Sequence, residues 1–318
     1  MHDGHSERNA RFASGARMPD LHGPLVITGA SGFVGRALVP QVSAPCTSLS
    51  FGAPDWERRL ADVELGGATI FHLAARVHGR SDDEGAFQAD NVHKTHRLAQ
   101  AAASAGARRL VFLSTIKVHG EESRGRPFQA GDPPAPEDAY ARSKADAEQA
   151  LHEVASQSKL ELVVVRAPLV YGPCARANLA ALLRLADSPW PLPFASLTAQ
   201  RSFIQVDDLA RLLIACGELP AASGKTYIAA HPTGVSAARV VSLMRVSLGR
   251  PERLFRMPAS ALEATGALVG QAASARRLTR PLLGDPSAAN RELQWSAQVP
   301  IEHAVEEMVR EYRARGRH

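Results

Sequence analysis

A short apolar run that ends in a cluster of glycines constrains the fold of this chain most strongly. Residues 24–28 (PLVIT) are typical of a buried strand, and Gly29, Gly32 and Gly35 follow with the spacing GxxGxxG before a helical stretch that reaches about Val42. Glycines at such a turn let the backbone approach a pyrophosphate, which binds the N–H groups at the start of the helix. A chance triplet is the competing interpretation, because the chain has 24 glycines. The flanking strand and helix favour a nucleotide-binding turn.

Further apolar strands alternate with helices along the first half of the chain. Strands are expected at 46–50, 69–73, 109–114 and 160–166, and helices at 86–105 and 138–157. This alternation predicts an α/β fold, a Rossmann-like doubly wound parallel sheet.

Beyond Pro173 the pattern becomes mostly helical and ends in an amphipathic helix at about 301–315. Residues 202–206, 207–217 and 226–230 are expected to add one more strand, helix and strand to the sheet. We therefore predict three parts, which are a disordered tail at 1–23, a dinucleotide-binding domain at 24–173 plus about 203–231, and a smaller, mostly helical substrate domain at about 174–202 plus 232–318.

The composition is that of a globular protein with a large core, since 45% of the 318 residues are hydrophobic and 22% are charged. The net charge of +5 is spread over scattered arginines without a lysine-rich run, so no nucleic-acid partner is expected. Three separated cysteines and twelve dispersed histidines show no metal-ligand spacing, so no metal is expected. Residues 1–23 lack the apolar segment of a signal peptide, and no apolar stretch approaches the length of about 20 residues that spans a bilayer. We expect a cytoplasmic protein that does not bind membranes.

Tyr140 and Lys144 are four residues apart on an expected helix and therefore share one face. An ammonium beside a phenol favours the phenolate, so the pair predicts a pKa for Tyr140 below its usual value of about 10. A tyrosine of this kind moves the proton when an alcohol is oxidised or a ketone is reduced. A packed helix face is the competing interpretation. Its stripe consists of Tyr140, Lys144, Ala147 and Leu151, with Asp146, Glu148 and Glu153 assigned to other faces.

Five segments occur in a characteristic order, namely TGASGFVG (28–35), FHLAAR (71–76), LST with VHG (113–120), YARSK (140–144) and RAPLVYGP (166–173). Together they resemble the extended short-chain dehydrogenase/reductase family, and within it the NAD-dependent epimerase/dehydratase group that acts on nucleotide sugars. RSFIQVDDLA (201–210) is similar to a second-domain segment of that group. The resemblance extends from about Pro24 to Trp295.

The resemblance implies roles for individual residues. Tyr140 is the acid/base, Lys144 is its partner and holds the nicotinamide ribose, and Thr115 hydrogen-bonds the reacting sugar oxygen. The coenzyme, which is NAD or NADP, is implied to contact the Tyr–Lys pair and Gly29, Ser31, Gly32, Phe33, Val34, Gly35, Leu73, Ala74, Ala75, Asn91, Ser114 and Ala167. The nucleotide-sugar substrate is implied to contact Thr115, Tyr140, Asn178 and Arg201, the last through its phosphates.

Simpler structural roles compete with some of these assignments. The Thr115 hydroxyl can satisfy backbone groups at the end of its strand. Asn91 can position its helix, and Arg201 can form a surface ion pair. We expect His72 to be a buried strand histidine and Arg166 to form hydrogen bonds around its strand.

The chain departs from the family pattern in several places. No acidic residue lies between Gly35 and Asp55, where an acid about 20 residues after the glycine turn would bind the 2′-hydroxyl of NAD. The segment from Gly35 to His72 is shorter than in the family, as if one helix and one strand were missing. Leu169 replaces an asparagine near the substrate diphosphate, and His119 replaces the tyrosine of a VYG motif.

The resemblance implies oxidoreduction at C4 of a UDP-sugar in surface-polysaccharide synthesis. The enzyme is then a nucleotide-sugar 4-epimerase or a reductase of a UDP-4-keto-6-deoxy-N-acetylhexosamine. A dehydratase fits less well, because Ile116 and Lys117, instead of an acidic pair, follow Thr115. The alternatives are a reductase of a steroid- or flavonoid-like ketone and a non-catalytic coenzyme-binding protein. By analogy with relatives, a homodimer is expected through a four-helix bundle that includes the tyrosine helix.

Overall fold

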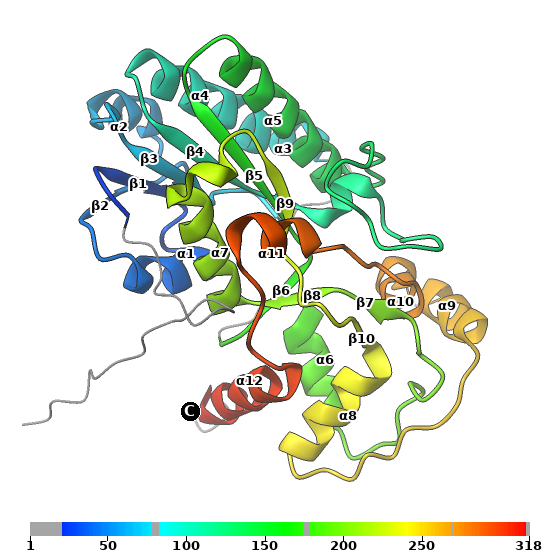
Figure 1. The fold of residues 1–318 in the computed structure, drawn as a ribbon. Coiled ribbons are helices and arrows are strands. Elements are labelled where there is room, and N and C mark those ends of the chain that lie inside the picture. Colours follow the sequence, from blue (N-terminus) through cyan, green and yellow to red (C-terminus); the bar gives the residue numbers. More distant parts are fainter. Residues whose placement is uncertain (1–20, 78–82, 174–177, 269, 316–318) are drawn as a thin grey trace, which may run out of the picture.

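A parallel sheet forms the centre of the computed structural model, which describes residues 21–77, 83–173, 178–268 and 270–315 (Figure 1). Its six strands, in spatial order, are β2 (Cys46–Leu49), β1 (Leu25–Thr28), β3 (Thr69–His72), β4 (Arg109–Thr115), β5 (Glu161–Ala167) and β9 (Thr226–Ile228). Each pair of neighbours runs parallel. The predicted doubly wound parallel sheet is therefore confirmed.

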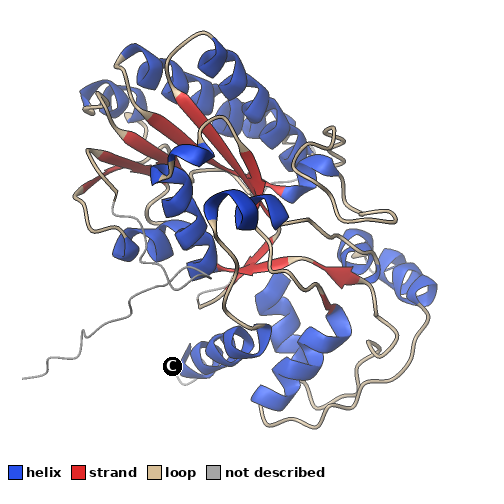
Figure 2. Cartoon of the chain, in the orientation of Figure 1, coloured by secondary structure: helices blue, strands red, loops and turns tan. Residues whose placement is uncertain are grey.

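Helices cover both faces of the sheet (Figure 2). On one face lie α2 (Trp56–Asp62), α3 (Glu84–Phe87), the π-helical turn η2 (Gln88–His93), α4 (Lys94–Ser104) and α5 (Ala139–Ser156). On the other face lie α1 (Phe33–Leu38), the 3₁₀ turn η1 (Val39–Gln41), α7 (Val206–Glu218) and α11 (Ser287–Leu293). Side chains of successive strand residues point to opposite faces, since Val26 packs under α2, α4 and α5 and Ile27 packs under α1 and α7.

The main sheet ends at β2, which follows the glycine turn. From β2 the chain passes through α2 directly to β3, on the far side of β1, so β2 is the only strand between Gly35 and Thr69. β2 is therefore the edge strand of the sheet, and it lies directly beside β1, the strand that leads into the glycine turn.

A second group of elements packs around its own core below the sheet (Figure 1). Its helices are α6 (Asn178–Ala186), α8 (Ala237–Ser247), α9 (Ala259–Leu268), α10 (Ala272–Thr279) and α12 (Ile301–Arg315). Its short strands are β6 (Leu169–Tyr171), which pairs with β8 (Phe203–Gln205), and β7 (Gln200–Arg201), which pairs with β10 (Val235–Ser236). The division of the chain into two domains stays a prediction.

One strand lies elsewhere than the sequence suggests. The strand at 203–205 was expected in the main sheet, but it pairs with β6 in a separate two-stranded sheet, and only β9 of that unit joins the main sheet. The physical reason is Pro168, which has no backbone N–H to continue the β5 ladder, so β6 leaves the sheet and takes β8 as its partner.

Two expectations from the sequence concern the N-terminal tail and membrane-spanning segments. Residues 1–20 of the expected tail lie outside the described residues, whereas Leu21 is buried against the core. In the part of the chain that the structure describes, no helix is both long and apolar enough to cross a membrane.

Candidate active site

The glycine turn brings three backbone segments into close approach at the carboxyl end of the sheet. Gly29 has a φ of +73°, and a Cβ on it would lie 2.8 Å from the backbone nitrogen of Ala74. A Cβ on Gly35 would lie 2.3 Å from the carbonyl oxygen of Gly29, to which the N–H of Gly32 donates at 2.9 Å. No side chain caps α1, so the turn presents bare backbone N–H groups. Ser31 beside this turn is exposed, and Phe33 and Val34 in the first turn of α1 are half-buried.

His72 links β1 and β3 to the helix behind them. One ring nitrogen lies 2.6 Å from the Thr28 hydroxyl and the other 2.7 Å from the Thr95 hydroxyl. Burial, with a contribution from the charge of Lys144, lowers the pKa of His72 to about 3, so the ring is neutral. The expected structural role of His72 is confirmed. The Thr28 hydroxyl also accepts from the N–H of Ala74 at 3.2 Å, which fixes the loop formed by Leu73, Ala74 and Ala75 against the glycine turn.

Asn91 connects this loop to the helix that carries the tyrosine. It lies in the π-helical turn η2 and is buried. Its amide oxygen accepts from the N–H of Arg76 at 2.7 Å, and its amide nitrogen donates to the Arg76 carbonyl at 3.0 Å and to the Ser143 hydroxyl at 2.9 Å. Ser143 in turn donates to the Tyr140 carbonyl at 2.8 Å. The Asn91 side chain therefore joins the Arg76 backbone to α5 through Ser143, a residue that the sequence analysis missed, and its contact with a coenzyme stays a prediction.

Helix α5 is held at its start by ionic contacts. Asp138 caps the helix by accepting from the N–H of Ala141 at 2.6 Å. Lys117, two residues after Thr115, is paired with Asp138 and lies 2.5 Å from a carboxylate oxygen of Glu121. This bridge ties the end of β4 to the first turn of α5, where Tyr140 is located.

The protonation equilibria of the Tyr–Lys pair differ from the sequence-based expectation. Burial, followed by the negative charge of Asp138, raises the pKa of the Tyr140 phenol above its ordinary value. Burial lowers the pKa of Lys144 to about 7, while the carboxylate of Glu148 opposes this shift. The prediction of a lowered tyrosine pKa is therefore wrong for the protein alone. The reason is burial, which disfavours the charged phenolate, and the Lys144 ammonium nitrogen lies 3.8 Å from the centroid of the Phe112 ring.

A buried polar network lies one helical turn beyond Lys144. Glu148 accepts from the Ser114 hydroxyl and forms an ion pair with Arg166, whose Nη2 lies 2.5 Å from the carboxylate. Arg166 also hydrogen-bonds the imidazole Nε2 of His119 at 3.0 Å. Burial, followed by the charge of Arg166, lowers the pKa of His119 to about 4.

The assignment of Glu148 to another helix face is wrong, since the structure buries it on the Lys144 side. The spacing of four residues from Lys144 was the available signal. The expectation that Arg166 forms hydrogen bonds around its strand is confirmed.

The strand ends place the remaining candidates side by side. Thr115 ends β4 and pairs in register with Ala167, the last residue of β5, and Ser114 pairs with Arg166. The Thr115 hydroxyl accepts from the N–H of Lys117 at 3.3 Å, which is the local role that competes with substrate binding. A hydroxyl also has a proton to donate, so this contact leaves Thr115 able to hydrogen-bond a ligand.

Arg201 lies in β7, which pairs with β10 outside the main sheet. Its guanidinium donates to the Arg280 carbonyl at 2.8 Å and forms no ion pair among the described residues. Burial lowers the pKa of Arg201 to about 10, against the opposing charge of Glu121, so it remains a cation at neutral pH. A surface ion pair is therefore not its role. Asn178 begins α6, and its side chain lies outside the described residues; Leu169 on β6 is half exposed.

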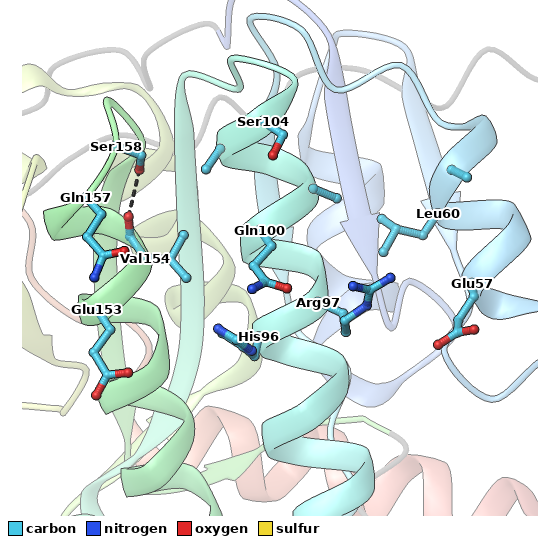
Figure 3. A pocket seen from close by; sticks show the side chains of 13 residues that line it. Glu57, Leu60, His96, Arg97, Gln100, Ser104, Glu153, Val154, Gln157 and Ser158 are labelled. Atoms are coloured by element: carbon cyan, nitrogen blue, oxygen red, sulfur yellow. Dashed lines mark hydrogen bonds between the residues drawn. The ribbon is translucent and has the colours of Figure 1, made fainter.

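A groove of about 640 Å³ lies apart from these residues, on the outer side of α2, α4 and α5 (Figure 3). Figure 3 shows polar side chains along it, among them His96 and Gln100 from α4 and Glu153 and Gln157 from α5. None of the candidate site residues lines it. Among the described residues there is also no group of three or more metal-binding side chains.

Comparisons with known proteins agree with this geometry. A family model described as the NAD dependent epimerase/dehydratase family matches residues 53–230. A UDP-glucose 4-epimerase from Vibrio cholerae is 31% identical over 298 residues, covering 85% of this chain and 90% of that protein.

Two solved structures share the fold. A short-chain dehydrogenase/reductase superfamily protein from Agrobacterium tumefaciens with bound NAD superposes with a TM-score of 0.75 at 18% identity, covering 92% of this chain and 98% of that one. A UDP-glucose 4-epimerase from Thermotoga maritima with UDP-glucose gives a TM-score of 0.74 at 18% identity, covering 92% and 99%. The similarity of fold extends over nearly the whole chain.

Proposed function

The chain belongs to the NAD dependent epimerase/dehydratase family, and from this premise we propose that it is an NAD(P)-dependent enzyme acting at C4 of a UDP-sugar. One observation carries the proposal. The carboxyl ends of the parallel strands hold the glycine turn and Thr115, and an ion pair ties the end of β4 to the helix that carries Tyr140. The chain with this arrangement is 31% identical to a UDP-glucose 4-epimerase over 85% of its length.

The residues at the sheet edge fit a dinucleotide. A Cβ on Gly29 or Gly35 would meet backbone atoms at 2.8 and 2.3 Å, so this tight turn requires glycine at both positions. In sheets of this class, such a turn lets the pyrophosphate of a dinucleotide approach the backbone. We infer that the pyrophosphate binds Gly29, Ser31, Gly32, Phe33, Val34 and Gly35, and that the rest of the coenzyme contacts Leu73, Ala74, Ala75, Asn91, Ser114, Tyr140, Lys144 and Ala167. When bound, the coenzyme accepts or returns a hydride and, in its oxidised form, adds a positive charge that favours a phenolate.

Tyr140 and Lys144 supply the proton chemistry in this proposal. Tyr140 takes the proton of the C4 hydroxyl during oxidation and gives a proton to that oxygen during reduction. Lys144 has a pKa of about 7, so both of its protonation states are populated near neutral pH. Thr115, at the neighbouring strand end, donates a hydrogen bond that orients the reacting oxygen.

Arg201 supplies the anion-binding part of the site. It is a half-buried guanidinium without an ion-pair partner in the described chain, and a diphosphate satisfies such a group with charge-assisted hydrogen bonds. We propose that Asn178, at the start of α6, contacts the same substrate. A steroid- or flavonoid-like ketone has no phosphate and leaves Arg201 unpaired, which disfavours that alternative.

Two reactions at C4 remain, namely 4-epimerisation and reduction of a 4-keto sugar. The relative from Vibrio cholerae favours the epimerase. A dehydratase needs an acid and a base beside the threonine, but Ile116 and Lys117 follow Thr115 here. Lys117 forms ion pairs with Asp138 and Glu121. These residues disfavour a dehydratase. A non-catalytic coenzyme-binding protein would not require the buried contacts that hold Tyr140, Lys144 and Thr115 in place.

The test is to denature the purified protein and identify any released dinucleotide, then to assay UDP-glucose, UDP-N-acetylglucosamine and a UDP-4-keto sugar. Retained NAD with epimerisation supports the epimerase. Consumption of NAD(P)H with the keto sugar supports the reductase. UDP should raise the thermal unfolding temperature of the wild type and not of Arg201→Gln. A protein that neither binds a dinucleotide nor turns over any of these substrates contradicts the proposal.

We further propose a homodimer through α4 and α5. The groove between these helices exposes polar side chains of both along its length, as Figure 3 shows, and a second copy of the same helices would complete a four-helix bundle. Light scattering should give twice the mass of the chain. Gln100→Arg with Gln157→Arg, which places like charges across the two-fold axis, should give the mass of one chain.

A further inference from the structure

Lys144 is a buried amine that lies against an aromatic ring. Its side chain is 1% exposed, and its nitrogen lies 3.8 Å from the centroid of the Phe112 ring. A ring face attracts an ammonium group, but burial favours the neutral amine. Lys144 therefore needs a negatively charged neighbour if it is to act as a cation.

Glu148 is the anion that acts on Lys144. The two residues lie four apart on α5, which places them on one face of the helix, and both are buried. The charge of Glu148 opposes the lowering of the Lys144 pKa by burial, and His72, which faces Lys144 from β3, is neutral. The other acidic side chains on α5 or packed against it have partners elsewhere, namely Asp138 with Lys117, Asp146 with Gln88, Glu153 with Gln149, Asp90 with Arg76 and Lys94, and Glu84 with Arg142.

The Glu148 carboxylate is itself fixed by groups from two strands. From β4 the Ser114 hydroxyl donates to one of its oxygens. From β5 the Nε of Arg166 lies 3.1 and 3.2 Å from the two oxygens, and its Nη2 lies 2.5 Å from one of them. Ser114 and Arg166 pair in register, and Thr115 directly follows Ser114. The carboxylate is thus held in a fixed position relative to the strand end that carries Thr115.

Arg166 is held in turn on its other side. Its Nη1 donates to the Ala130 carbonyl at 2.8 Å and to Nε2 of His119 at 3.0 Å. Burial, followed by the charge of Arg166, lowers the pKa of His119 to about 4, so the imidazole is neutral near pH 7 and can accept this hydrogen bond. The His119 ring also stacks on Phe128, with 5.1 Å between the centroids. These contacts keep the guanidinium in place against Glu148.

We propose that Glu148 is a positioning residue for the reaction, and that its carboxylate, held by Ser114 and Arg166, stabilises the protonated form of Lys144 one helical turn from Tyr140. Glu148 acts through Lys144 and not on the reacting atoms. The inference rests on the proposed function for the task of Lys144, but the protonation of Lys144 can be measured in the protein without any ligand.

Nuclear magnetic resonance of the full chain with carbon-13-labelled lysine tests the inference. The Cε resonance that disappears in Lys144→Met belongs to Lys144, and in the wild type it should titrate near pH 7. Glu148→Gln keeps the shape of the side chain and removes its charge, so the midpoint should fall by about one pH unit or more. Glu153→Gln, an exposed change on the same helix, should leave the midpoint unchanged. The spectrum is simple, because the lysines of the chain are Lys94, Lys117, Lys144, Lys159 and Lys225.

A second variant separates this role from a purely structural one. Glu148→Gln leaves Arg166 as a buried charge without its partner, whereas Glu148→Gln combined with Arg166→Met removes both charges and keeps the fold. In the double variant the Lys144 midpoint should stay below that of the wild type by a similar amount. The decline of kcat at high pH should also begin at a lower pH, because the ammonium form is lost earlier. If the network only supports the fold, the double variant regains both the midpoint and the pH profile of the wild type.

The outcomes distinguish the inference from the proposed function. A Lys144 midpoint that is the same in the wild type, Glu148→Gln and the double variant overturns the inference and leaves the proposed function intact. A wild type that neither binds a dinucleotide nor turns over a UDP-sugar contradicts the proposed function, while the titration still shows whether Glu148 governs the charge of Lys144.

Discussion

The two ends of the proposed coenzyme site differ in how firmly their side chains are held. Around α5, Lys144, Glu148 and Arg166 are buried, and hydrogen bonds or ring contacts fix each of them. Near the other end, Ser50 after β2 and Arg36 on α1 are exposed and lack such contacts in the described chain. Proton transfer needs fixed geometry and controlled protonation, whereas coenzyme choice depends on a few surface groups. The exposed groups can therefore be substituted without disturbing the core.

The largest effect is expected where the buried network is broken. Glu148→Ala leaves Arg166 as an uncompensated buried charge, which should lower the free energy of unfolding by about 3–5 kcal/mol. Glu153→Ala, an exposed change on the same helix, should stay within about 0.5 kcal/mol. Urea denaturation measures both. Equal losses of unfolding free energy in the two variants would contradict the claim that the buried network around Glu148 holds this end of the site.

A pair of glycines tests the same contrast at the coenzyme turn. A Cβ on Gly35 would lie 2.3 Å from the Gly29 carbonyl oxygen, while a Cβ on Gly52, beyond β2, would meet nothing within 4 Å. Gly35→Ala should cost about 1–3 kcal/mol of unfolding free energy and weaken dinucleotide binding. Gly52→Ala should be nearly neutral in both thermal unfolding and calorimetric titration. If Gly35→Ala binds NAD(P)+ as the wild type does, the turn does not hold the pyrophosphate.

A smaller effect concerns pH. Lys144 has a pKa of about 7 in the folded protein against an ordinary 10.5, so between these values the unfolded chain binds more protons than the folded one. The free energy of unfolding should therefore rise with pH across this range, by at most about 1.4 kcal/mol per pH unit from this group. In Lys144→Met this contribution to the slope should vanish. An unchanged slope, measured by urea denaturation at pH 7, 8 and 9, would show that the lysine keeps its ordinary pKa.

The sequence predicts the backbone of this protein better than its electrostatics. The strands at 69–73 and 109–114 and the tyrosine helix follow from apolar periodicity, and the glycine spacing predicts the turn. The pairing of β8 with β6 could not be predicted, because it depends on where Pro168 ends a ladder. Short strands can find partners in more than one sheet.

The site shows the same limit. Tyr140, Lys144 and Thr115 could be found from motifs, but the direction of the Tyr140 pKa could not, since it depends on burial and on the nearby charge of Asp138. Glu148 was missed although its spacing from Lys144 was visible, because a carboxylate on a helix is expected to face solvent. Its burial becomes evident only with Arg166, which comes from a different strand.

The most direct test of the central claim is the turnover of Tyr140→Phe with the UDP-sugar that the wild type uses. This variant keeps the ring against Phe87 and removes only the hydroxyl. The account predicts that kcat falls by about 10²–10⁴-fold, because the group that moves the C4 proton is gone. Dinucleotide affinity, measured by calorimetry on the same sample, should stay within about threefold. Turnover near that of the wild type would contradict the account, because the proton would then be transferred by another group.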